Sequence, residues 1–544
     1  SKRTFWALRG YHRAILGYLE RGAPTSLPAC RVARHEHICS ATENYLATAE
    51  VVLKQPRLHL ARTFLTMLTR LEAHGFKNLL NFSVDFSPFT CIAGPNGVGK
   101  SNVFDAIRFL SLLADHPIME AAKRIRGGQR ENKTEDENVF WEPKDMFWTN
   151  GEQTLDTITL GVEMIVDRDI QDDFGRPASA RSTFLRYDIE IAYEEPEHRS
   201  SFGRLRLVSE RLTYIPEGDA RQHMYFPHSG ENFRRHVVTN KRRGADYIST
   251  ETAHDGQTEI LVHQDGGSSG RPQRSPAEDA PRTIVATTNT STTPTVLAAR
   301  REMQKWRTLA LEPSAMRRSD RFYTDPHLRM NGGHLPSTLY RLAETADDSA
   351  QILSSISNRL NELIPLEDIR VDVDDVRQLL TLEAKERSGV YLPARSLSDG
   401  TLRFLTLCIL AEDPEFTGLL CMEEPENGIH PARLPSMVDL LRDIAVDPEC
   451  PPGDDNPLRQ IVVATHSPAL VQLQHEDDLL HAERAAVQNP LDLKGQPATA
   501  LRCSPLRGTM RAERTPGVGK GSLLSYLTDP PGAQIVLDPA LSST

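Results

Sequence analysis

The sequence predicts an α/β fold in which a mixed sheet has a parallel core and an antiparallel flank, accompanied by a helical subdomain and a disordered insert. Three observations predict this fold class. A glycine-rich motif lies between a strand-like and a helix-like segment. A later apolar run has the composition of a parallel strand buried on both faces. Three further strand-like runs after the first helix are expected to form the antiparallel flank.

The first lobe is expected to begin with a strand hairpin. Residues 68–74 (LTRLEAH) and 81–86 (NFSVDF) are predicted as its strands, and 89–93 (FTCIA) as a third strand that leads into the glycines. After Lys100, apolar residues such as Val103 and Ile107 recur at helical spacing, which predicts a helix. The runs TITLGVEMIV, RYDIEIAY and RLRLVSERLTY are predicted to form the flanking sheet.

The segment 94–101 reads GPNGVGKS and matches the phosphate-loop pattern G-x-x-x-x-G-K-S/T, after a strand and before a helix. Its glycines let backbone N–H groups point at phosphate oxygens, and the helix N-terminus adds about half a positive charge. We expect Lys100 to bridge the β- and γ-phosphates and Ser101 to offer its hydroxyl to Mg²⁺. The fold class is therefore a P-loop NTPase. The nucleotide-binding residues expected here are Gly94, Pro95, Asn96, Gly97, Val98, Gly99, Lys100, Ser101 and Asn102.

A second string, TPGVGKGS at 515–522, lacks the first glycine of the pattern, because Arg514 stands there and no apolar strand precedes it. We interpret it as a surface turn.

Acidic residues follow the apolar strand GLLCM near the C-terminal half of the chain. Glu423 and Glu424 stand at its end, within GLLCMEEPENGIHP. An acid at this position can hold Mg²⁺, and the next can polarise the attacking water. A solvated surface pair is the alternative, and the strand and the phosphate loop favour the catalytic reading. A later β-branched strand, QIVVA, delivers His466 at the strand edge where ligands bind, so we expect it to contact the γ-phosphate.

The stretch RSLSDGTLRFLTLCIL predicts a second helix N-terminus with small residues at its entrance. Such an end can bind an anion, and because the phosphate loop surrounds its own nucleotide, this end is expected to engage a nucleotide held by another subunit. An ordinary capped helix is the alternative reading. The expected contact residues are Leu397, Ser398, Asp399 and Gly400.

Together, the phosphate loop, the LSDGT signature, EEPENGIHP and THSP resemble the ABC-type ATPase heads of the RecF, SMC and OLD-like group. More narrowly, they resemble prokaryotic predicted AAA-type ATPases with an SDGTLRF signature, which are associated with defence or repair. The resemblance covers about Leu68 to Leu473. It implies an ATP-dependent head-to-tail homodimer or higher oligomer, in which Lys100 of one protomer and Ser398 of the other enclose one ATP. It also implies Glu423 at Mg²⁺, Glu424 as catalytic base and His466 as the γ-phosphate switch.

Some positions depart from the related pattern. Glu423 stands where transporter-type domains carry Asp, and the signature has Asp399 where they have Gly. The Q-loop glutamine is not securely placed; Gln129 is a weak candidate, and a solvated loop is the favoured reading.

The chain is divided by changes in pattern and composition, and residues 1–66 are expected either to precede a start at Met67 or to form a helical appendage. The predicted division is a basic N-terminal extension (1–66), a first ATPase lobe (67–215), a variable and partly disordered insert (216–295), a helical subdomain (296–380), a second ATPase lobe (381–475) and a C-terminal tail (476–544).

Composition narrows the class of protein. Seven cysteines without a C-x-x-C pair fit neither a disulfide framework nor a zinc site, and no apolar run reaches the roughly 18–20 residues of a membrane span, so a cytoplasmic protein without a membrane partner is expected. A net charge of −11 argues against a protein that coats nucleic acid with its whole surface. The basic stretches 233–243 and 306–321 could contact DNA, although solvated faces are the favoured reading.

The intervening segments exclude two architectures of related proteins. The roughly 300 residues between phosphate loop and signature show no sustained heptads, which excludes a long coiled-coil arm. Only about 70 residues follow the THSP strand, without a convincing set of metal-binding acids, so any nuclease chemistry would need a separate effector protein. The leading hypothesis is an ATP-hydrolysing dimeric switch in DNA repair or anti-phage defence. The alternatives are a scaffold with structural ATP that holds a nuclease or toxin, and, less favoured, a transporter energy subunit.

Overall fold

The computed structural model describes residues 66–126, 142–196, 203–240, 246–253, 256–265, 271–346, 349–364, 366–453, 455–491 and 497–523. The chain separates into residues 1–60 and residues 61–544, and every described residue belongs to the second unit. The predicted N-terminal extension up to residue 65, the Q-loop candidate Gln129 and residues 524–544 lie outside the described residues.

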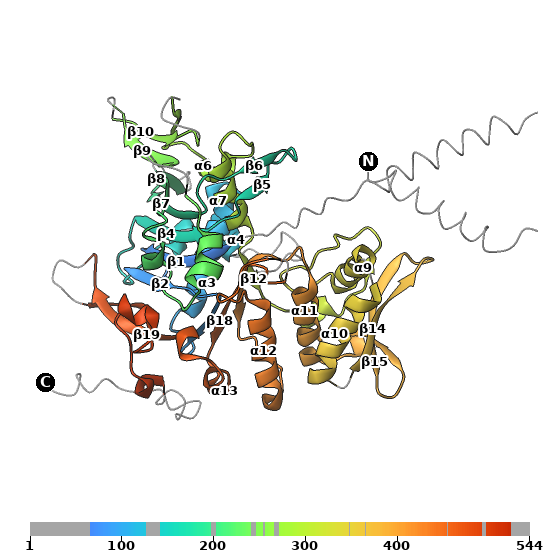
Figure 1. The fold of residues 1–544 in the computed structure, drawn as a ribbon. Helices are drawn as coiled ribbons and strands as arrows, with labels where there is room; N and C mark the ends of the chain where they lie inside the picture. The colour runs from blue at the N-terminus through green and yellow to red at the C-terminus, as the bar shows by residue number, and fades with distance from the viewer. Residues whose placement is uncertain are drawn as a thin grey trace, which may run out of the picture. The chain divides into compact units, whose positions relative to one another are not determined.

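A six-stranded sheet forms the centre of the described unit, in the order β12-β17-β18-β3-β19-β20 (Figure 1). Its neighbours are parallel except for the last pair, β19 and β20. Continuous burial along β3, β17 and β18 matches the predicted buried parallel strands. The strands are β3 (Phe89–Ala93), β12 (Arg307–Leu309), β17 (Gly418–Glu423), β18 (Arg459–Thr465), β19 (Leu479–Gln488) and β20 (Pro497–Pro505).

Helices cover both faces of this sheet, and alternate residues of β17 show how. Leu419 and Cys421 join one hydrophobic cluster with α3 (Lys100–Leu113) and α7 (Pro294–Gln304). Leu420 and Met422 join a second cluster with α11 (Asp399–Glu412) and α12 (Leu434–Ile444). Because successive side chains of a strand point to opposite faces, one apolar run supplies both cores.

An eight-stranded antiparallel sheet flanks the parallel core, in the order β11-β10-β9-β8-β7-β4-β1-β2. The predicted hairpin and the three predicted flanking strands are confirmed as β1 and β2, and as β4, β7 and β8. The strands are β1 (Met67–His74), β2 (Phe82–Asp85), β4 (Thr157–Ile165), β7 (Phe184–Glu194), β8 (Arg204–Tyr214), β9 (Ile248–Thr252), β10 (Thr258–Val262) and β11 (Gln273–Pro276).

The remaining described elements include a layer of helices and strands beside α11. There α10 packs on β14 and α9 packs on β15. Both strands belong to a small antiparallel sheet. The elements of this layer are α8 (Pro313–Met316), β13 (Asp320–Arg321), α9 (Leu335–Thr345), α10 (Ser349–Leu363), β14 (Leu366–Asp374), β15 (Leu379–Glu386) and β16 (Tyr391–Pro393). Elsewhere lie α4 (Ile118–Arg126), β5 (Asp169–Gln171), β6 (Pro177–Ser179), α5 (Arg235–Val237), α6 (Ile284–Thr287) and α13 (Pro468–Gln472).

The predicted helical subdomain, 296–380, is not purely helical, because this range also contains strands. Strands return at Leu366 rather than near residue 380, and the alternation of apolar and charged residues over 369–374 is the period-2 pattern of a half-exposed strand. The same range contains an earlier strand. Residues 307–309 form β12, which pairs in parallel with β17 at the edge of the core sheet.

The predicted disorder of the insert is also wrong for the residues described there. β11 pairs with β10, and α6 is capped by Thr283. The buried carboxylate of Glu210, on β8, accepts hydrogen bonds from the backbone N–H groups of Ile284 (2.6 Å) and Val285 (3.0 Å). A polar, Thr-rich stretch is thus anchored by a tertiary partner that its own composition does not reveal.

The segment predicted as a C-terminal tail belongs to the core sheet. β19 pairs in parallel with β3, and β20 pairs with β19. Buried Arg511 also donates hydrogen bonds to Ser87 Oγ (2.6 Å) and Thr90 Oγ1 (2.9 Å), next to β3. The predicted boundary at residue 475 therefore divides one sheet. Across the described ranges, no helix has the length and apolar character needed to cross a membrane.

The buried side chain of Gln460, on β18, joins the two large sheets. Its Oε1 accepts a hydrogen bond from Leu68 N (2.9 Å), and its Nε2 donates to Leu68 O (2.8 Å) and Ser87 O (3.0 Å). The amide thereby satisfies backbone groups of β1 and of the turn before β3 that would otherwise be buried without partners.

We expect Gln460→Ala to lower the free energy of unfolding by about 2–4 kcal/mol, because it leaves several buried backbone groups unsatisfied. Urea denaturation followed by circular dichroism measures this loss. Gln472→Ala, at an exposed position of α13, is the matched control and should change stability by less than about 0.5 kcal/mol. Equal unfolding midpoints for Gln460→Ala and the wild type would contradict the role assigned to this amide.

Candidate active site

The carboxyl ends of three parallel strands bring the main predicted residues to one edge of the core sheet. In the register of the sheet, Thr465 of β18 lies opposite Ala93 of β3, and Glu423 of β17 lies opposite Ala464. Backbone hydrogen bonds extend the pairing, from Gly94 N to Thr465 O (3.2 Å) and from Glu424 N to Ala464 O (2.8 Å). The phosphate loop, the acidic pair and His466 therefore start from neighbouring strand ends, which is where ligands bind in open α/β sheets.

The phosphate loop, residues 94–99, needs its glycines for two different reasons. Gly97 and Gly99 have φ values of +76° and +106°, which favour glycine. A Cβ on Gly94 would lie 2.3 Å from Ala482 O, and one on Gly99 would lie 2.0 Å from Asn78 Nδ2. The loop is thus a tight backbone turn closely packed by its neighbours, as a phosphate cradle requires.

Asn78, in the turn between β1 and β2, holds this loop and was not singled out from the sequence. Its Nδ2 donates to Val98 O (2.8 Å), and its Oδ1 accepts from Asn102 Nδ2 (2.7 Å). Arg484, on β19, donates to Gly97 O (2.7 Å) from the other side. An Asn in a polar turn gives no sequence signal for such a contact, because the packing of the hairpin on the loop creates it.

Lys100 opens α3, and its buried ammonium lies within the loop. It donates hydrogen bonds to Gly94 O (2.6 Å) and Pro95 O (2.8 Å). Burial lowers the pKa of the Lys100 ammonium, while the carboxylates of Glu424 and Glu423 oppose that shift. The cation and the two acids therefore act on one another across the strand ends. Ser101 follows with an exposed side chain in the first turn of α3.

The two predicted acids differ in their surroundings. Glu423 is exposed at the end of β17, as a metal-binding side chain would need to be. Glu424 has a φ of +46°, a strained conformation for a residue with a side chain, of the kind found at functional sites. Its Oε2 accepts from Asn427 Nδ2 (2.7 Å), and its Oε1 lies 2.5 Å from His466 Nδ1. The structure thus brings the two predicted catalytic residues into contact.

Glu426 is a functional candidate that sequence reasoning missed. Its side chain is buried, and its Oε1 accepts a hydrogen bond from Thr465 Oγ1, next to His466. Its other oxygen has no hydrogen-bond partner among the described residues. Burial raises the pKa of the Glu426 carboxyl, and the charge of Glu424 acts in the same direction. In the sequence, Glu426 is visible only as the third acid of EEPE. The two adjacent acids at the strand end gave the stronger signal, so Glu426 was not predicted.

The signature segment forms the N-terminus of α11, as predicted. Ser398 is the N-cap, and its Oγ accepts from Thr401 N (3.2 Å). Asp399, which stands where transporter-type domains have Gly, forms an ion pair with Arg317 (2.5 Å). A Cβ on Gly400 would lie 2.7 Å from Gly428 O, so glycine allows the helix to approach the loop that follows β17.

One chain does not place its signature on its own phosphate loop. Figure 1 shows α3 and α11 apart, with β12 between them. The predicted residues therefore form two groups, one at the ends of β3, β17 and β18, and one at the start of α11.

The nucleotide and its metal fit the first group. The glycine-lined turn, the Lys100 ammonium and the N-terminus of α3 suit a triphosphate. Ser101 and Glu423 offer the oxygen ligands that Mg²⁺ prefers, together with phosphate oxygens. Among the described residues, no group of three or more His, Cys, Asp or Glu could hold a metal ion by itself.

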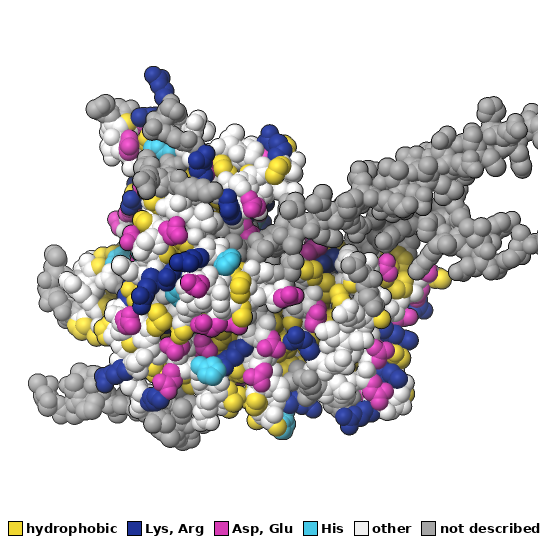
Figure 2. Space-filling view, in the orientation of Figure 1, with side chains coloured by type: hydrophobic (Ala, Val, Ile, Leu, Met, Phe, Trp, Pro, Cys, Tyr) yellow, Lys and Arg dark blue, Asp and Glu magenta, His cyan; other side chains and the backbone are white. Residues whose placement is uncertain are grey.

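The string 515–522 and the basic residues are the remaining predicted features. The string 515–522 follows a turn rather than a strand, and Val518 is bridged to Leu506. Residues 515–519 lie outside helices and regular strands, whereas residues 520–523 are helical, so the predicted surface turn covers only part of the string. On the face drawn in Figure 2, Lys and Arg side chains are interspersed with Asp and Glu. That face therefore offers no continuous basic surface.

Two family models match the chain, one on each side of the long central segment. "AAA domain, putative AbiEii toxin, Type IV TA system" matches residues 293–472, and "AAA domain" matches residues 70–157. These ranges contain the phosphate loop, the signature, the acidic pair and His466.

Curated relatives match over short segments. The chain is 44% identical over 64 residues to "Chromosome partition protein Smc" of Halothermothrix orenii, covering 11% of this chain and 5% of that protein. It is 43% identical over 51 residues to "DNA replication and repair protein RecF" of Parabacteroides distasonis, covering 9% of this chain and 14% of that protein. The chain thus matches only a small part of the length of these relatives.

Solved structures of SMC heads also resemble the chain. One is the "SmcHead bound to the C-winged helix domain of ScpA", with a TM-score of 0.39 and 13% identity over 81% of this chain and 98% of that chain. Another is the "SMC head domain from Thermotoga maritima", with a TM-score of 0.33 and 12% identity over 81% of this chain and 99% of that chain.

The raised pKa of Glu426 predicts a pH-dependent stability. In the unfolded chain, a glutamate carboxyl has a pKa of about 4.3. Between that pH and the higher folded pKa the folded state binds more protons, so the free energy of unfolding falls as pH rises. Glu426→Gln keeps an acceptor for Thr465 and removes this titration. Its stability relative to the wild type should therefore increase from pH 5 upward and level off above the folded pKa.

Urea midpoints of both proteins at several pH values measure this difference. Glu513→Gln is the matched control at an exposed position, and it should change stability by less than about 0.5 kcal/mol. A Glu426→Gln difference that stays constant or shrinks with rising pH would show that the folded carboxyl is not held in its protonated form.

Proposed function

We propose that this chain, which is an ATPase head of the ABC, SMC and RecF type, is a switch that pairs two heads around ATP and reopens on hydrolysis. The observation that carries the proposal is the separation of the two half-sites. The phosphate loop, Glu423, Glu424 and His466 gather at one sheet edge, while the signature helix starts elsewhere on the same chain. A second copy, placed head to tail, would supply the missing half.

Binding of ATP follows from the groups at the sheet edge. Backbone N–H groups of residues 94–101 would hold the β- and γ-phosphates, and the Lys100 ammonium would exchange its two carbonyl acceptors for phosphate oxygens. Ser101 and Glu423 would hold Mg²⁺, which, when bound, neutralises charge on the β- and γ-phosphates. The buried position of Lys100 strengthens its attraction to phosphate, because water screens it less.

Glu424 would act as the general base for an attacking water. Asn427 and His466 each contact one carboxylate oxygen, which orients the group toward the strand ends. In the proposed step Glu424 accepts a proton from water, the water oxygen bonds to the γ-phosphorus, and ADP leaves with the electrons of the broken bond. His466 would sense the γ-phosphate, and Glu426 would hold the adjoining Thr465 in place.

The second half-site adds positive potential to the γ-phosphate. The N-terminus of α11 carries about half a positive charge, and Ser398 presents a hydroxyl beside it. The Arg317–Asp399 pair fixes the acidic signature residue at the side of the helix start, where it would repel phosphate less than a free carboxylate. ATP would favour the closed pair only by these additional contacts, and their loss on hydrolysis would release it.

A role in DNA repair or anti-phage defence with a separate effector is part of the proposal. The matching family description names a putative AbiEii toxin, and a matching relative is named a DNA replication and repair protein. The described residues hold no cluster that could bind a nuclease metal, which supports a division of labour with another protein.

Glu424→Gln tests the switch directly. The substitution removes the base and retains the size and hydrogen bonding of the side chain, so we expect ATP to bind and kcat to fall by about 100-fold or more. The closed dimer should then accumulate with magnesium and ATP, which analytical ultracentrifugation measures. Hydrolysis at the wild-type rate would refute the base assignment. A persistent monomer would refute ATP-driven pairing, and a wild type that binds ATP without turnover would indicate the scaffold alternative.

Mixing two inactive variants tests whether the site is shared between protomers. Lys100→Ala removes the phosphate-loop cation, and Ser398→Arg blocks the signature. Each alone should be inactive, and a head-to-tail heterodimer restores one site with both native residues. Equal mixing should therefore recover up to about a quarter of the wild-type ATPase activity, if half of the dimers are mixed and sites act independently.

Unfolding midpoints of both variants, measured first, exclude loss of fold as the cause of inactivity. Each variant assayed alone at the same total protein concentration sets the baseline, because neither homodimer has a site with both native residues. Two folded but inactive variants that stay inactive when mixed would argue against a shared site.

A further inference from the structure

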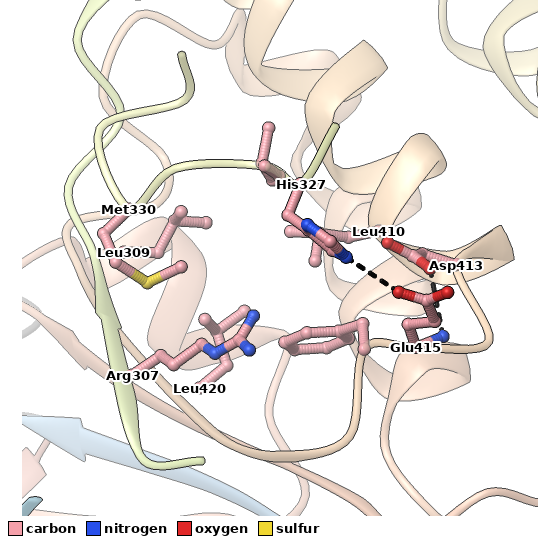
Figure 3. A pocket seen from close by; sticks show the side chains of 10 residues that line it. Arg307, Leu309, His327, Met330, Leu410, Asp413, Glu415 and Leu420 are labelled. Atoms are coloured by element: carbon pink, nitrogen blue, oxygen red, sulfur yellow. Dashed lines mark hydrogen bonds and ion pairs between the residues drawn. The ribbon is translucent and has the colours of Figure 1, made fainter. Parts of the chain in front are cut away.

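A pocket of about 170 Å³ lies at the edge of the core sheet, apart from the phosphate loop (Figure 3). Leu309 of β12, Leu410 of α11 and Leu420 of β17 supply apolar walls, together with Phe416 in the loop between α11 and β17. Arg307, at the start of β12, lines it with its guanidinium directed inward. The pocket wall is thus mixed: the leucines and Phe416 form an apolar part, and Arg307 faces it beside other polar side chains.

The acidic side chains of this pocket are already paired. Asp413 Oδ2 lies 2.6 Å from Arg341 Nη2, and its Oδ1 accepts from Glu415 N (3.0 Å). Glu415 Oε2 lies 2.8 Å from His327 Nε2, which Figure 3 shows across the pocket from Arg307. His327 also contacts Asp325 (2.6 Å), and hydrogen bonds to these two carboxylates raise the pKa of the imidazole above its usual value.

Arg307 differs sharply from a second arginine that holds the same loop. Arg459 is buried, and its three nitrogens donate to the carbonyl oxygens of Phe416 (2.9 Å), Ala411 (2.7 Å) and Asp413 (2.8 Å). No hydrogen bond or ion pair joins the Arg307 guanidinium to any described residue, and Asp413 attracts it only from a distance. The loop is therefore held rigid by one arginine while the other faces the pocket without a partner.

Such a guanidinium is costly in the absence of a partner. The Arg307 side chain is half-buried, and its burial lowers the pKa of the guanidinium. A partly buried cation without an acceptor destabilises a fold, and replacing it by an apolar side chain of similar size often stabilises. Structures that retain such a group commonly use it to bind something.

We propose that this pocket binds a small organic monocarboxylate, with the carboxylate on Arg307 and the apolar body against the leucines and Phe416. The planar fork of a guanidinium matches a carboxylate in a bidentate geometry. The volume suits a body about the size of a benzene ring, since a cavity of about 150 Å³ accommodates benzene. The assignment does not depend on ATP hydrolysis.

Binding is tested with benzoate on the full chain by saturation-transfer NMR and calorimetry, without nucleotide. Benzamide has the same shape without the charge and should bind at least about tenfold more weakly. Arg307→Gln should weaken benzoate binding by at least about tenfold, whereas Arg387→Gln, at an exposed site between β15 and β16, should leave it within about twofold. Equal binding of benzoate and benzamide, or binding of neither benzoate nor N-acetylleucine, would overturn the proposal.

A free acid and the terminal carboxylate of a peptide share this chemistry. N-acetylleucine represents the second source and is compared with benzoate on the wild type and on Arg307→Gln. Tighter binding of either probe, lost in the variant, supports the carboxylate site and identifies its source. Binding of both probes that persists in Arg307→Gln would overturn it.

The stability of Arg307→Met is an independent test of the proposal. If Arg307 only supported the fold, the substitution would lower stability, whereas the proposed binding role predicts an increase. Arg307→Met removes the unpartnered charge and keeps an apolar side chain, so it should raise the urea midpoint of the unliganded protein. Arg459→Met removes a guanidinium with three backbone acceptors and should lower that midpoint strongly. A fall in stability on Arg307→Met would show that Arg307 supports the fold and would overturn the proposal.

Discussion

The parallel register of β3, β18 and β17 is the constraint on which the rest of the structure depends. It sets Thr465 opposite Ala93, and Glu423 opposite Ala464, so three chain segments far apart in sequence end at one edge. Backbone hydrogen bonds beyond the strands extend this pairing into the phosphate loop and to Glu424. A slip of one residue would turn apolar side chains from one core to the other, and so burial on both faces fixes the register as firmly as hydrogen bonding does.

The antiparallel sheet stabilises that edge from outside. Gln460 extends hydrogen bonding from β18 to the backbone of β1, and Asn78 contacts the phosphate loop from the hairpin turn. Both side chains supply partners to backbone groups that water cannot reach, or can reach only in part. The phosphate cradle is therefore a property of two sheets together, although its glycines and lysine lie in one short motif.

Charge placement separates parts that support the fold from parts available to ligands. Arg459 and Arg317 are engaged, the first by three carbonyl groups and the second by Asp399 and Leu397 O. Glu426 and Arg307 keep unused hydrogen-bonding capacity among the described residues, the first next to Thr465 of β18 and the second at the start of β12. The Arg307 pocket adjoins β17, which carries the acidic pair, and α11, which carries the signature. Its walls thus belong to the elements that form both half-sites.

The sequence alone determined the phosphate loop, the acidic strand end, His466 and the capped signature helix, because each depends on local chemistry: glycine conformations, a strand that ends in charge, a cap beside an apolar helix. It also predicted the hairpin and the flanking sheet. It missed β12 and β14, the order within the insert, and the place of β19 and β20 in the core. Those depend on partners far along the chain, such as Glu210 for α6 and β3 for β19. Asn78, Glu426 and Arg307 gained their roles only in the tertiary structure, because burial and the absence or presence of a nearby acceptor are properties of packing rather than of residue type.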